Sequence, residues 1–185
     1  MIKVKKIPKD CILACSGGVD SMVLFHYLIN GRKQFSVYHF DHGTPFATSA
    51  KNLVKEICEK HKVLFECFSF GGQVATEYTW RNWRNEIMQQ AGKPVITAHH
   101  EEDSIESWLM RTTKMSYNIG NIYRPFIDAS KKSITDYASR NGINFIEDPS
   151  NVDTSYKRNK VRHELLPLMR QIGINPLSLM GKSHE

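Results

Sequence analysis

The feature that most constrains the fold is an apolar run that passes through two adjacent glycines into a helical pattern. Cys11–Cys15 is apolar, residues 16–21 read Ser-Gly-Gly-Val-Asp-Ser, and apolar residues then recur at helical spacing. The order predicts a strand, a tight turn and a helix that begins near Asp20. Glycines let the backbone approach a ligand closely, and the free N–H groups and positive dipole end of the helix face the same place. The turn therefore predicts an anion site of the kind that binds phosphate.

The turn differs from the two best-known phosphate loops. Its glycines do not have Gly-x-Gly-x-x-Gly spacing, and no Lys follows them as in the Walker loop. Ser16 and Ser21 offer further donors, and Asp20 could hold Mg²⁺ against phosphate oxygens. The alternative is a flexible Ser-Gly-Gly turn before an ordinary Asp-Ser helix start. By themselves, the glycines imply only an anion.

Strand and helix patterns alternate through the first 111 residues. Strands are predicted at 35–40, 63–70 and 95–98, and helices at 49–61 (with Ser49 as N-cap), 76–91 and 102–111. Alternation of this kind predicts the α/β class, a Rossmann-like parallel sheet flanked by helices on both faces. Ligands of such sheets bind beyond the carboxyl ends of the strands. The loops at 16–21, 41–48 and 99–102 are expected to meet at that edge.

The pattern changes after Met110. Residues 112–123 are polar without a clear period and are expected to form a surface loop. A helix capped by Ser130 should run to Arg140, followed by a short strand at 143–146 and a turn at 148–151. A last helix is expected from 154 to 171, with Pro167 kinking it or ending it early.

Length and composition narrow the class of protein. The 185 residues suit one domain, and no apolar stretch is long enough to span a bilayer or resembles a secretion signal. The four cysteines lack Cys-x-x-Cys spacing, which favours buried thiols in a reducing, cytoplasmic setting. The net charge of +6 favours a polyanionic partner, nucleic acid above all.

Two motifs combine histidine, arginine and aromatic residues. His39-Phe40-Asp41-His42-Gly43 ends a predicted strand and could orient a phosphate, a ribose or a metal, or could simply be a polar loop start. Arg81 and Arg84 are interleaved with tryptophans in the helix at 76–91. They could clamp phosphate, or they could be solvated while the tryptophans pack in the core.

Two further motifs carry complementary charge. His99, Asp103 and Glu106 have the i, i+4, i+7 spacing of one helix face, and the carboxylates could hold an ammonium group or Mg²⁺. The alternative is that acidic residues merely suit the start of a helix. Arg158 and Arg162 share a face of the last helix, where their repulsion suggests an anion between them; a solvated charged face is the alternative.

Taken in order from residue 11 to about 170, the motifs resemble the tRNA(Ile)-lysidine synthetase family. Its first motif is the PP-loop signature of the N-type ATP pyrophosphatases. The resemblance implies an adenine nucleotide alpha hydrolase-like fold and ATP with Mg²⁺ as cofactors. It implies that ATP adenylates the wobble cytidine of an isoleucine tRNA (with a CAU anticodon). The amine of free lysine then displaces AMP to give lysidine.

The resemblance also implies roles for particular residues. The nucleotide would be bound by Ser16, Gly17, Gly18, Val19, Asp20, Ser21, His39, Asp41, His42, Gly43 and His99. Asp20 would hold Mg²⁺, while Asp103 and Glu106 would receive the lysine ammonium or a metal. Arg81 would act at the reacting phosphates, and contacts with phosphate or tRNA would come from Arg84, Arg124, Arg158, Asn159 and Arg162.

The sequence departs from the family pattern at three points. The glycine-rich stretch before Arg124-Pro125 is replaced by 112–123, and Ser104 stands where the family has Gln. The third departure concerns domains. Residues 1–111 are expected to form the PP-loop core and 112–185 the helical, basic remainder of the same catalytic domain, with no separate tRNA-recognition domain. A homodimer could lengthen the RNA surface. Another PP-loop enzyme acting on tRNA, such as a thiolase, and a non-catalytic RNA-binding relative remain alternatives.

Overall fold

The computed structural model describes residues 1–71, 76–111 and 115–180, and these contain a six-stranded sheet. Its strands are β1 (Cys11–Ala14), β2 (Phe35–Asp41), β3 (Phe65–Ser69), β4 (Val95–Ile96), β5 (Asn118–Ile119) and β6 (Ile122–Tyr123). Their order is β3-β2-β1-β4-β6-β5, and all neighbours are parallel except β5 and β6. The expected α/β class is confirmed, with one antiparallel edge strand added to the parallel sheet.

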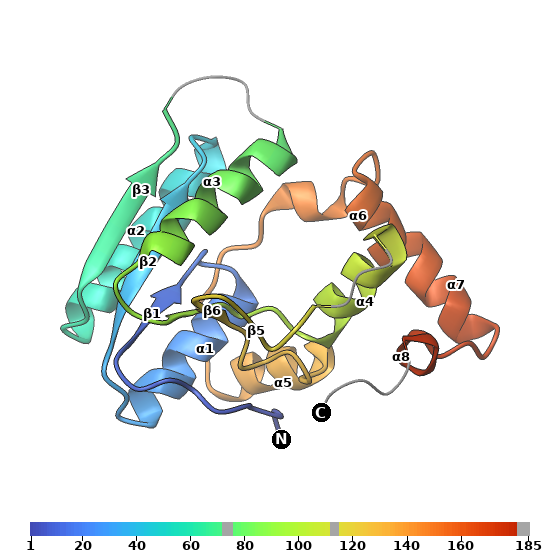
Figure 1. Ribbon diagram of the computed structural model, residues 1–185, viewed down its shortest axis with the longest axis horizontal. Helices are drawn as coiled ribbons and strands as arrows, with labels where there is room; N and C mark the ends of the chain where they lie inside the picture. The colour runs from blue at the N-terminus through green and yellow to red at the C-terminus, as the bar shows by residue number, and fades with distance from the viewer. Residues whose placement is uncertain (72–75, 112–114, 181–185) are drawn as a thin grey trace.

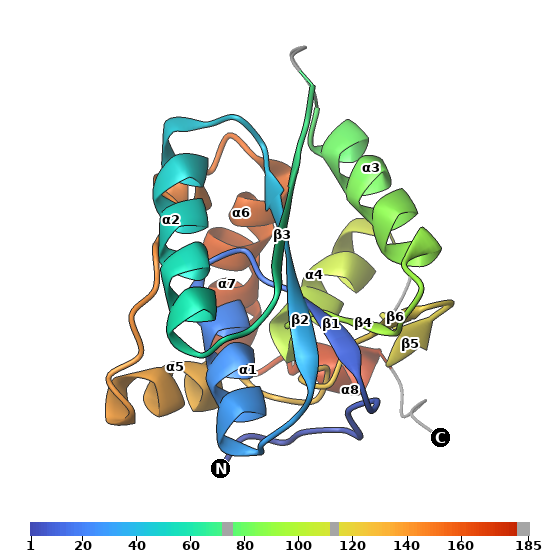
Figure 2. The ribbon, with the colours of Figure 1, turned by 90° about the vertical axis from the view of Figure 1, so that its left-hand side faces the viewer.

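Helices account for most of the remaining described chain. They are α1 (Val19–Asn30), α2 (Pro45–Lys60), α3 (Glu77–Gln90), α4 (Glu101–Arg111), α5 (Lys131–Arg140), α6 (Lys157–Lys160), α7 (Leu166–Gln171) and α8 (Pro176–Leu179). A 3₁₀ turn, Pro149–Val152, precedes α6, and a π-helical turn, Val161–Leu165, joins α6 to α7. Figure 2 shows α1, α2 and α5 on one face of the sheet and α3 on the other.

Apolar side chains fill both faces of the sheet. Leu13 and Val37 point to the side of α1 and α2, where they form the larger core with Leu24 and Val54. The opposite face is a smaller core of Ile12, Met88, Val95 and Ile122, in which Met88 comes from α3. Alternate residues of β1 serve the two cores, as the period of a strand requires.

A third apolar cluster joins the last helices to α4. Ile105 of α4 is buried against Leu166 of α7 and Met180, and Val161 packs beside them. Figure 1 shows α4 beside α6 and α7, to the side of the sheet. This packing brings α7 and Met180 against α4, which carries residues 101–106 of the motif at 99–106.

Several expectations about elements are corrected. Helix α2 begins at Pro45, because Thr44 caps it by accepting a hydrogen bond from the Ala47 N–H (3.2 Å), so Ser49 is not the N-cap. Of the expected surface loop at 112–123, residues 112–114 lie outside the described part and 118–123 form the β5–β6 hairpin. The hairpin turns at Gly120 with φ +56°, a conformation that glycine adopts easily.

The C-terminal third differs from the sequence expectation in two places. Residues 143–146 are not a strand: the Ile146 N–H donates to the Gly17 carbonyl (2.9 Å), and no ladder forms. The last helix runs from Lys157 to Gln171 without a break. Pro167 does not end it, because the π-helical turn that precedes Pro167 absorbs the irregularity.

Candidate active site

The glycine turn leaves the start of α1 open. Gly18 is the N-cap residue of α1 and supplies no side-chain hydrogen bond to the first turn. Gly17 has φ +85°, and a Cβ there would lie 3.1 Å from the Ala50 Cβ. Gly17 therefore allows α2 to pack directly on the turn, while the uncapped N–H groups of α1 remain available for an anion.

Two serine hydroxyls hold the turn. The Ser21 hydroxyl donates to the Gly18 carbonyl (2.9 Å) and lies 3.2 Å from the Ser16 hydroxyl. The Gly18 N–H donates to the Ser16 hydroxyl at 3.3 Å. The expected donors thus lie together at the start of α1, with Ser21 buried beneath the turn.

The end of β2 contributes the motif at 39–43. His39 is buried and its Nδ1–H donates to the Cys15 carbonyl (2.9 Å), and burial lowers its pKa. Asp41 accepts from the Gly43 N–H (2.9 Å) and from Lys51 Nζ (3.0 Å), and the Gly43 N–H chiefly holds its pKa below the ordinary value. This carboxylate is therefore ionised and already paired.

His42 lies between β2 and α3. Its ring centroid is 4.9 Å from that of Trp80, and Trp83 is also close, at 6.2 Å. Burial, followed by the charge of Arg84, lowers the pKa of His42 to about 4. Among the described residues, His42 Nδ1 and the Trp80 indole N–H are buried without a hydrogen-bond partner.

The start of α4 contributes the third motif. His99 precedes the helix, so the three motif residues do not share one helical face; its Nδ1 lies 2.8 Å from the Thr97 hydroxyl. Burial lowers the pKa of His99 to about 3, which keeps the ring neutral. Asp103 and Glu106, one turn apart on α4, are both buried.

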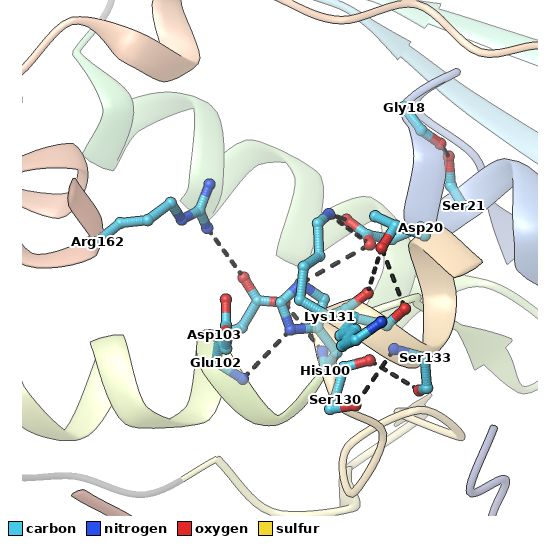
Figure 3. A network of polar contacts seen from close by, with 12 residues as sticks. Gly18, Asp20, Ser21, His100, Glu102, Asp103, Ser130, Lys131, Ser133 and Arg162 are labelled. Atoms are coloured by element: carbon cyan, nitrogen blue, oxygen red, sulfur yellow. Dashed lines mark hydrogen bonds and ion pairs between the residues drawn. The ribbon is translucent and has the colours of Figure 1, made fainter. Parts of the chain in front are cut away.

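A chain of polar contacts links the glycine turn to α4. Asp20, in the first turn of α1, has an oxygen 3.7 Å from His100 Nε2, and the same ring nitrogen lies 3.5 Å from Asp103 Oδ2. Asp103 Oδ2 also accepts from the His100 backbone N–H (2.9 Å). Figure 3 shows His100 between the two carboxylates. The loops after β1 and β4 therefore meet, as predicted from the parallel sheet.

Lys131 closes the other side of Asp20. Its ammonium lies 2.6 Å and 2.8 Å from the two oxygens of the Asp20 carboxylate. Lys131 is the first residue of α5, directly after the N-cap Ser130. Helices α1 and α5 pack together, which brings their first turns to the same edge.

Two arginines of the last helix close the acidic pair on α4. Arg158 donates to Asp103 Oδ1 (2.5 Å) through Nη2 and to Glu106 Oε2 (2.6 Å) through Nε. Arg162 donates to Glu106 Oε1 at 2.6 Å through Nε, and its Nη2 lies 3.6 Å from Asp103 Oδ1. The anion expected between the two arginines is thus Glu106, whose side chain is 1% exposed.

Asp103 is ionised in this arrangement. Burial alone raises its pKa, but the neighbouring His100, His99 and Arg158 outweigh burial and hold the pKa well below its ordinary value. Asp103 therefore keeps its negative charge although it is buried. A buried negative charge makes this end of the site suited to a cation.

The other predicted residues occupy more varied places. Arg84 is close enough to lower the pKa of His42 and His99, and Arg81 is half-buried on the same helix, α3. Arg124 lies near Asp103 and donates to the Ser116 carbonyl (2.9 Å); burial lowers its pKa. Asn159 is buried and donates to the Ser150 and Asp153 carbonyls, which positions the segment before α6 rather than the site itself.

Sequence reasoning missed two residues of the site. No role was predicted for His100, although it follows His99 directly. No role was predicted for Lys131 either, although it follows the expected N-cap residue Ser130. The capping signal at Ser130 could have identified Lys131, because it fixes which lysine stands at the start of α5. Nothing in the spacing shows that this start lies against α1.

Within the described chain, no three His, Cys, Asp or Glu residues form a metal cluster. Mg²⁺ typically keeps one or two protein carboxylates and takes its other ligands from phosphates and water. Asp20 beside an open helix start fits that pattern.

A comparison with protein families decides the relationship. The model of the PP-loop domain matches residues 2–169, which include every residue of this site. The chain belongs to the PP-loop family. The glycine turn and the helical segments up to residue 169 lie within the matched region.

Curated proteins that are similar to this chain include tRNA(Ile)-lysidine synthases. One from Aster yellows witches'-broom phytoplasma is 33% identical over 179 residues, 86% of this chain and 41% of the relative. One from Neisseria meningitidis is 32% identical over 183 residues, 86% of this chain and 43% of the relative. The chain therefore spans less than half the length of these relatives.

Solved structures support the same fold. NMN synthetase from Francisella tularensis superposes with a TM-score of 0.52, covering 96% of this chain and 79% of that one, at 14% identity. The NH3-dependent NAD synthetase from Campylobacter jejuni gives 0.51, covering 95% and 84%, at 12% identity. Both confirm the architecture of the sheet and its helices.

Proposed function

We propose that this chain is an ATP-dependent tRNA-modifying ligase of the lysidine synthase type. In this reaction a cytidine of tRNA(Ile) is adenylated with release of pyrophosphate, and lysine then displaces AMP to give lysidine. The observation that carries the proposal is the short path from the glycine turn to the acidic pair, through Asp20, His100 and Asp103. The similarity to lysidine synthases over 86% of the chain supports it.

One end of this path suits a nucleotide. The open start of α1 would receive the polyphosphate, with Ser16 and Ser21 nearby. Asp20 would hold Mg²⁺, which when bound would neutralise phosphate charge. His39, Asp41, His42 and Gly43 end the neighbouring strand and would lie beside the rest of the nucleotide, as would His99.

The other end suits an amine. Asp103 and Glu106 are buried and contact arginines, and the pKa of Asp103 is held well below its ordinary value. Buried carboxylates of this kind select a cation over a neutral group. Their guanidinium partners already occupy them, so an incoming lysine ammonium must compete with Arg158 and Arg162. A guanidinium displaced in this way would be free to turn toward the phosphates or the tRNA backbone.

The remaining residues would serve the RNA. We propose that residues 1–111 bind the nucleotide and that 112–185 supply cations, among them Arg124, while Arg81 and Arg84 on α3 would meet phosphate. Among the described residues, no helix has the length and apolar character needed to cross a bilayer. The four cysteines are free thiols, which supports a reducing, cytoplasmic setting.

The test is a reconstitution of the reaction. The chain is incubated with ATP, Mg²⁺, lysine and a tRNA(Ile) transcript, and AMP, pyrophosphate and the mass of the modified nucleoside are measured. AMP release that depends on both tRNA and lysine, with a cytidine heavier by one lysine less one water, supports the proposal. Release that depends on tRNA but leaves no lysine adduct indicates another PP-loop enzyme. RNA binding without any release indicates a non-catalytic relative.

A variant pair ties the reaction to the glycine turn. Asp20→Asn should abolish pyrophosphate release, because it removes the proposed Mg²⁺ ligand and keeps the shape of the side chain. Asp10→Asn is the matched control, since Asp10 is an exposed carboxylate paired with Lys93 before β1. Equal turnover by both variants would remove Asp20 from the site.

A further inference from the structure

We propose that Lys131 is a phosphate-binding residue that exchanges Asp20 for the polyphosphate when the nucleotide binds. The inference rests on the proposed function in one respect only, that a polyphosphate occupies the glycine turn. It concerns a residue outside every motif of the sequence, brought to the site by the packing of α5 on α1.

The first observation is the position of the ammonium group. Lys131 Nζ lies within 2.8 Å of both Asp20 oxygens, and Asp20 lies in the first turn of α1, two residues after Gly18. Figure 3 shows the Lys131 side chain extended from α5 toward Asp20, with Gly18 and Ser21 on the neighbouring turn. A cation is therefore already held at the rim of the anion site.

The second observation is the accessibility of this pair. The side chains of Lys131 and Asp20 are 33% and 28% exposed, so the ammonium can be reached by a ligand that enters from solvent. The neighbouring Lys132 differs: its side chain is 83% exposed and pairs with Asp136 within α5. Consecutive lysines thus point to different places, and only the first of them reaches the glycine turn.

Lys131 and Mg²⁺ would compete for the Asp20 carboxylate, and this competition would drive the exchange. The Asp20 oxygens that accept from Lys131 are those that would coordinate Mg²⁺ beside a phosphate. The Lys131 ammonium would be repelled by a divalent ion held on this carboxylate. Its four-carbon stem can swing, and its three donors suit oxygen anions. The nearest strong negative charge is then the polyphosphate at the start of α1. Lys131 moves to it, and balances the charge that develops on departing pyrophosphate.

The two states differ in what Lys131 neutralises. Without a ligand, the Lys131 ammonium balances the negative charge of Asp20. A second carboxylate, Asp103, lies on the other side of the His100 ring. With a ligand, Lys131 leaves Asp20 to the metal. Lys131 is therefore a binding residue for the phosphates.

The test uses inorganic pyrophosphate as the probe and calorimetry as the measurement. With Mg²⁺ present, Lys131→Met should weaken pyrophosphate binding about tenfold or more, because one charge-assisted hydrogen bond is removed. Lys131→Arg should restore most of the affinity, because it keeps a cation of similar reach. Lys132→Met is the matched control and should bind like the wild type. Far-ultraviolet circular dichroism establishes that each variant is folded.

A second comparison isolates the exchange itself. Without Mg²⁺, Asp20→Asn releases Lys131 and should bind pyrophosphate more tightly than the wild type. The gain should largely disappear in Asp20→Asn/Lys131→Met, which lacks the released cation. Equal affinity of these two variants overturns the inference, as does wild-type affinity in folded Lys131→Met. Neither result contradicts the proposed function if the tRNA- and lysine-dependent reaction is observed. That reaction tests the proposed function, and the binding measurements test the role of Lys131.

Discussion

Glu106 is the residue on which the acidic end of the site depends. It is buried, and each of its oxygens accepts from the Nε of a different arginine, Arg158 or Arg162. Buried ion pairs add little net stability compared with apolar packing, but removal of one partner leaves the others uncompensated. The strength of this cluster is therefore visible only when one of its charges is removed.

The first prediction concerns that removal. Glu106→Gln should lower the free energy of unfolding by about 2–3 kcal/mol, less than for a fully buried pair because the arginines are 28–29% exposed. Urea denaturation measures the change. Asp136→Asn, which breaks an exposed pair with Lys132 on α5, is the control and should leave the unfolding midpoint where it is. A Glu106→Gln midpoint equal to that of the control would contradict this account.

The second prediction concerns pH. Burial lowers the pKa of His42 to about 4 from an ordinary value of 6.5. Between these values the unfolded chain binds a proton that the folded chain does not, so stability should rise with pH from 4 to 6.5. Above 6.5 this histidine adds no further dependence.

His42→Gln tests the sign. Urea unfolding at pH 4.5 and 7.5 should show a smaller difference between the two pH values for the variant than for the wild type. The comparison cancels the other titrating groups, which both proteins share. A difference of the same size in both proteins would mean that His42 titrates normally in the folded state.

At the scale of elements, the β5–β6 hairpin extends the sheet beyond β4. The Asn121 amide donates to the Ala91 and Lys93 carbonyls at 2.9 Å and 2.7 Å, which ties the hairpin turn to the segment between α3 and β4. Gln89 completes the contact by donating to the Ile119 carbonyl and accepting from the Asn121 N–H. The hairpin is thus anchored by polar groups at its turn.

The third prediction follows from this anchor. Asn121→Ala should cost about 1–3 kcal/mol of stability, because it removes the side-chain donor that these two backbone carbonyls share. Thermal unfolding measures the decrease. Asn118→Ala, at an exposed position of the adjacent strand, is the control and should be close to neutral. Similar melting temperatures for the two variants would show that the hairpin does not depend on Asn121.

The hairpin also shows where sequence reasoning ends. Long periodic elements such as α1 and β2 were predictable, because their apolar spacing extends over several residues. β5 and β6 have two residues each, too few for a period to be recognised. The start of α2 was missed although Thr44-Pro45 is a capping residue followed by proline, a recognised helix start.

The site was predictable to a similar depth. The meeting of the motif loops followed from parallel strands, whose carboxyl ends share one edge. The partners of Asp20, Asp103 and Glu106 did not follow, because Lys131, Arg158 and Arg162 lie far along the chain. Pairing between distant charges depends on how helices pack, and no local spacing records it.

At the scale of the whole molecule, the net charge is +6, and the basic side chains behind it differ in whether they already contact carboxylates. Arg158 and Arg162 are directed into the acidic site, whereas Lys157 and Lys160 of the same helix are exposed. Exposed lysines beside the site are the cations available to an RNA backbone without rearrangement.

The fourth prediction is a salt dependence of RNA affinity. The logarithm of the affinity for tRNA should fall linearly with the logarithm of the salt concentration, because each phosphate contact releases counterions. Lys157→Ala/Lys160→Ala should reduce that slope by about one for each phosphate that a lysine no longer neutralises. Filter binding between 50 and 300 mM salt (about the range in which such charges are screened) measures it. An unchanged slope would place the RNA elsewhere.

The order of charges along the chain governs when the pocket matures. Asp20, Asp103 and Glu106 leave the ribosome before their counter-charges at positions 131, 158 and 162. Synthesis proceeds from the N-terminus, and early segments collapse before later ones arrive. A nascent chain therefore carries three carboxylates that must stay hydrated, and the sheet edge can dry out only after the last helix has emerged. The acidic end of the site is therefore completed only when Arg158 and Arg162 pack against α4.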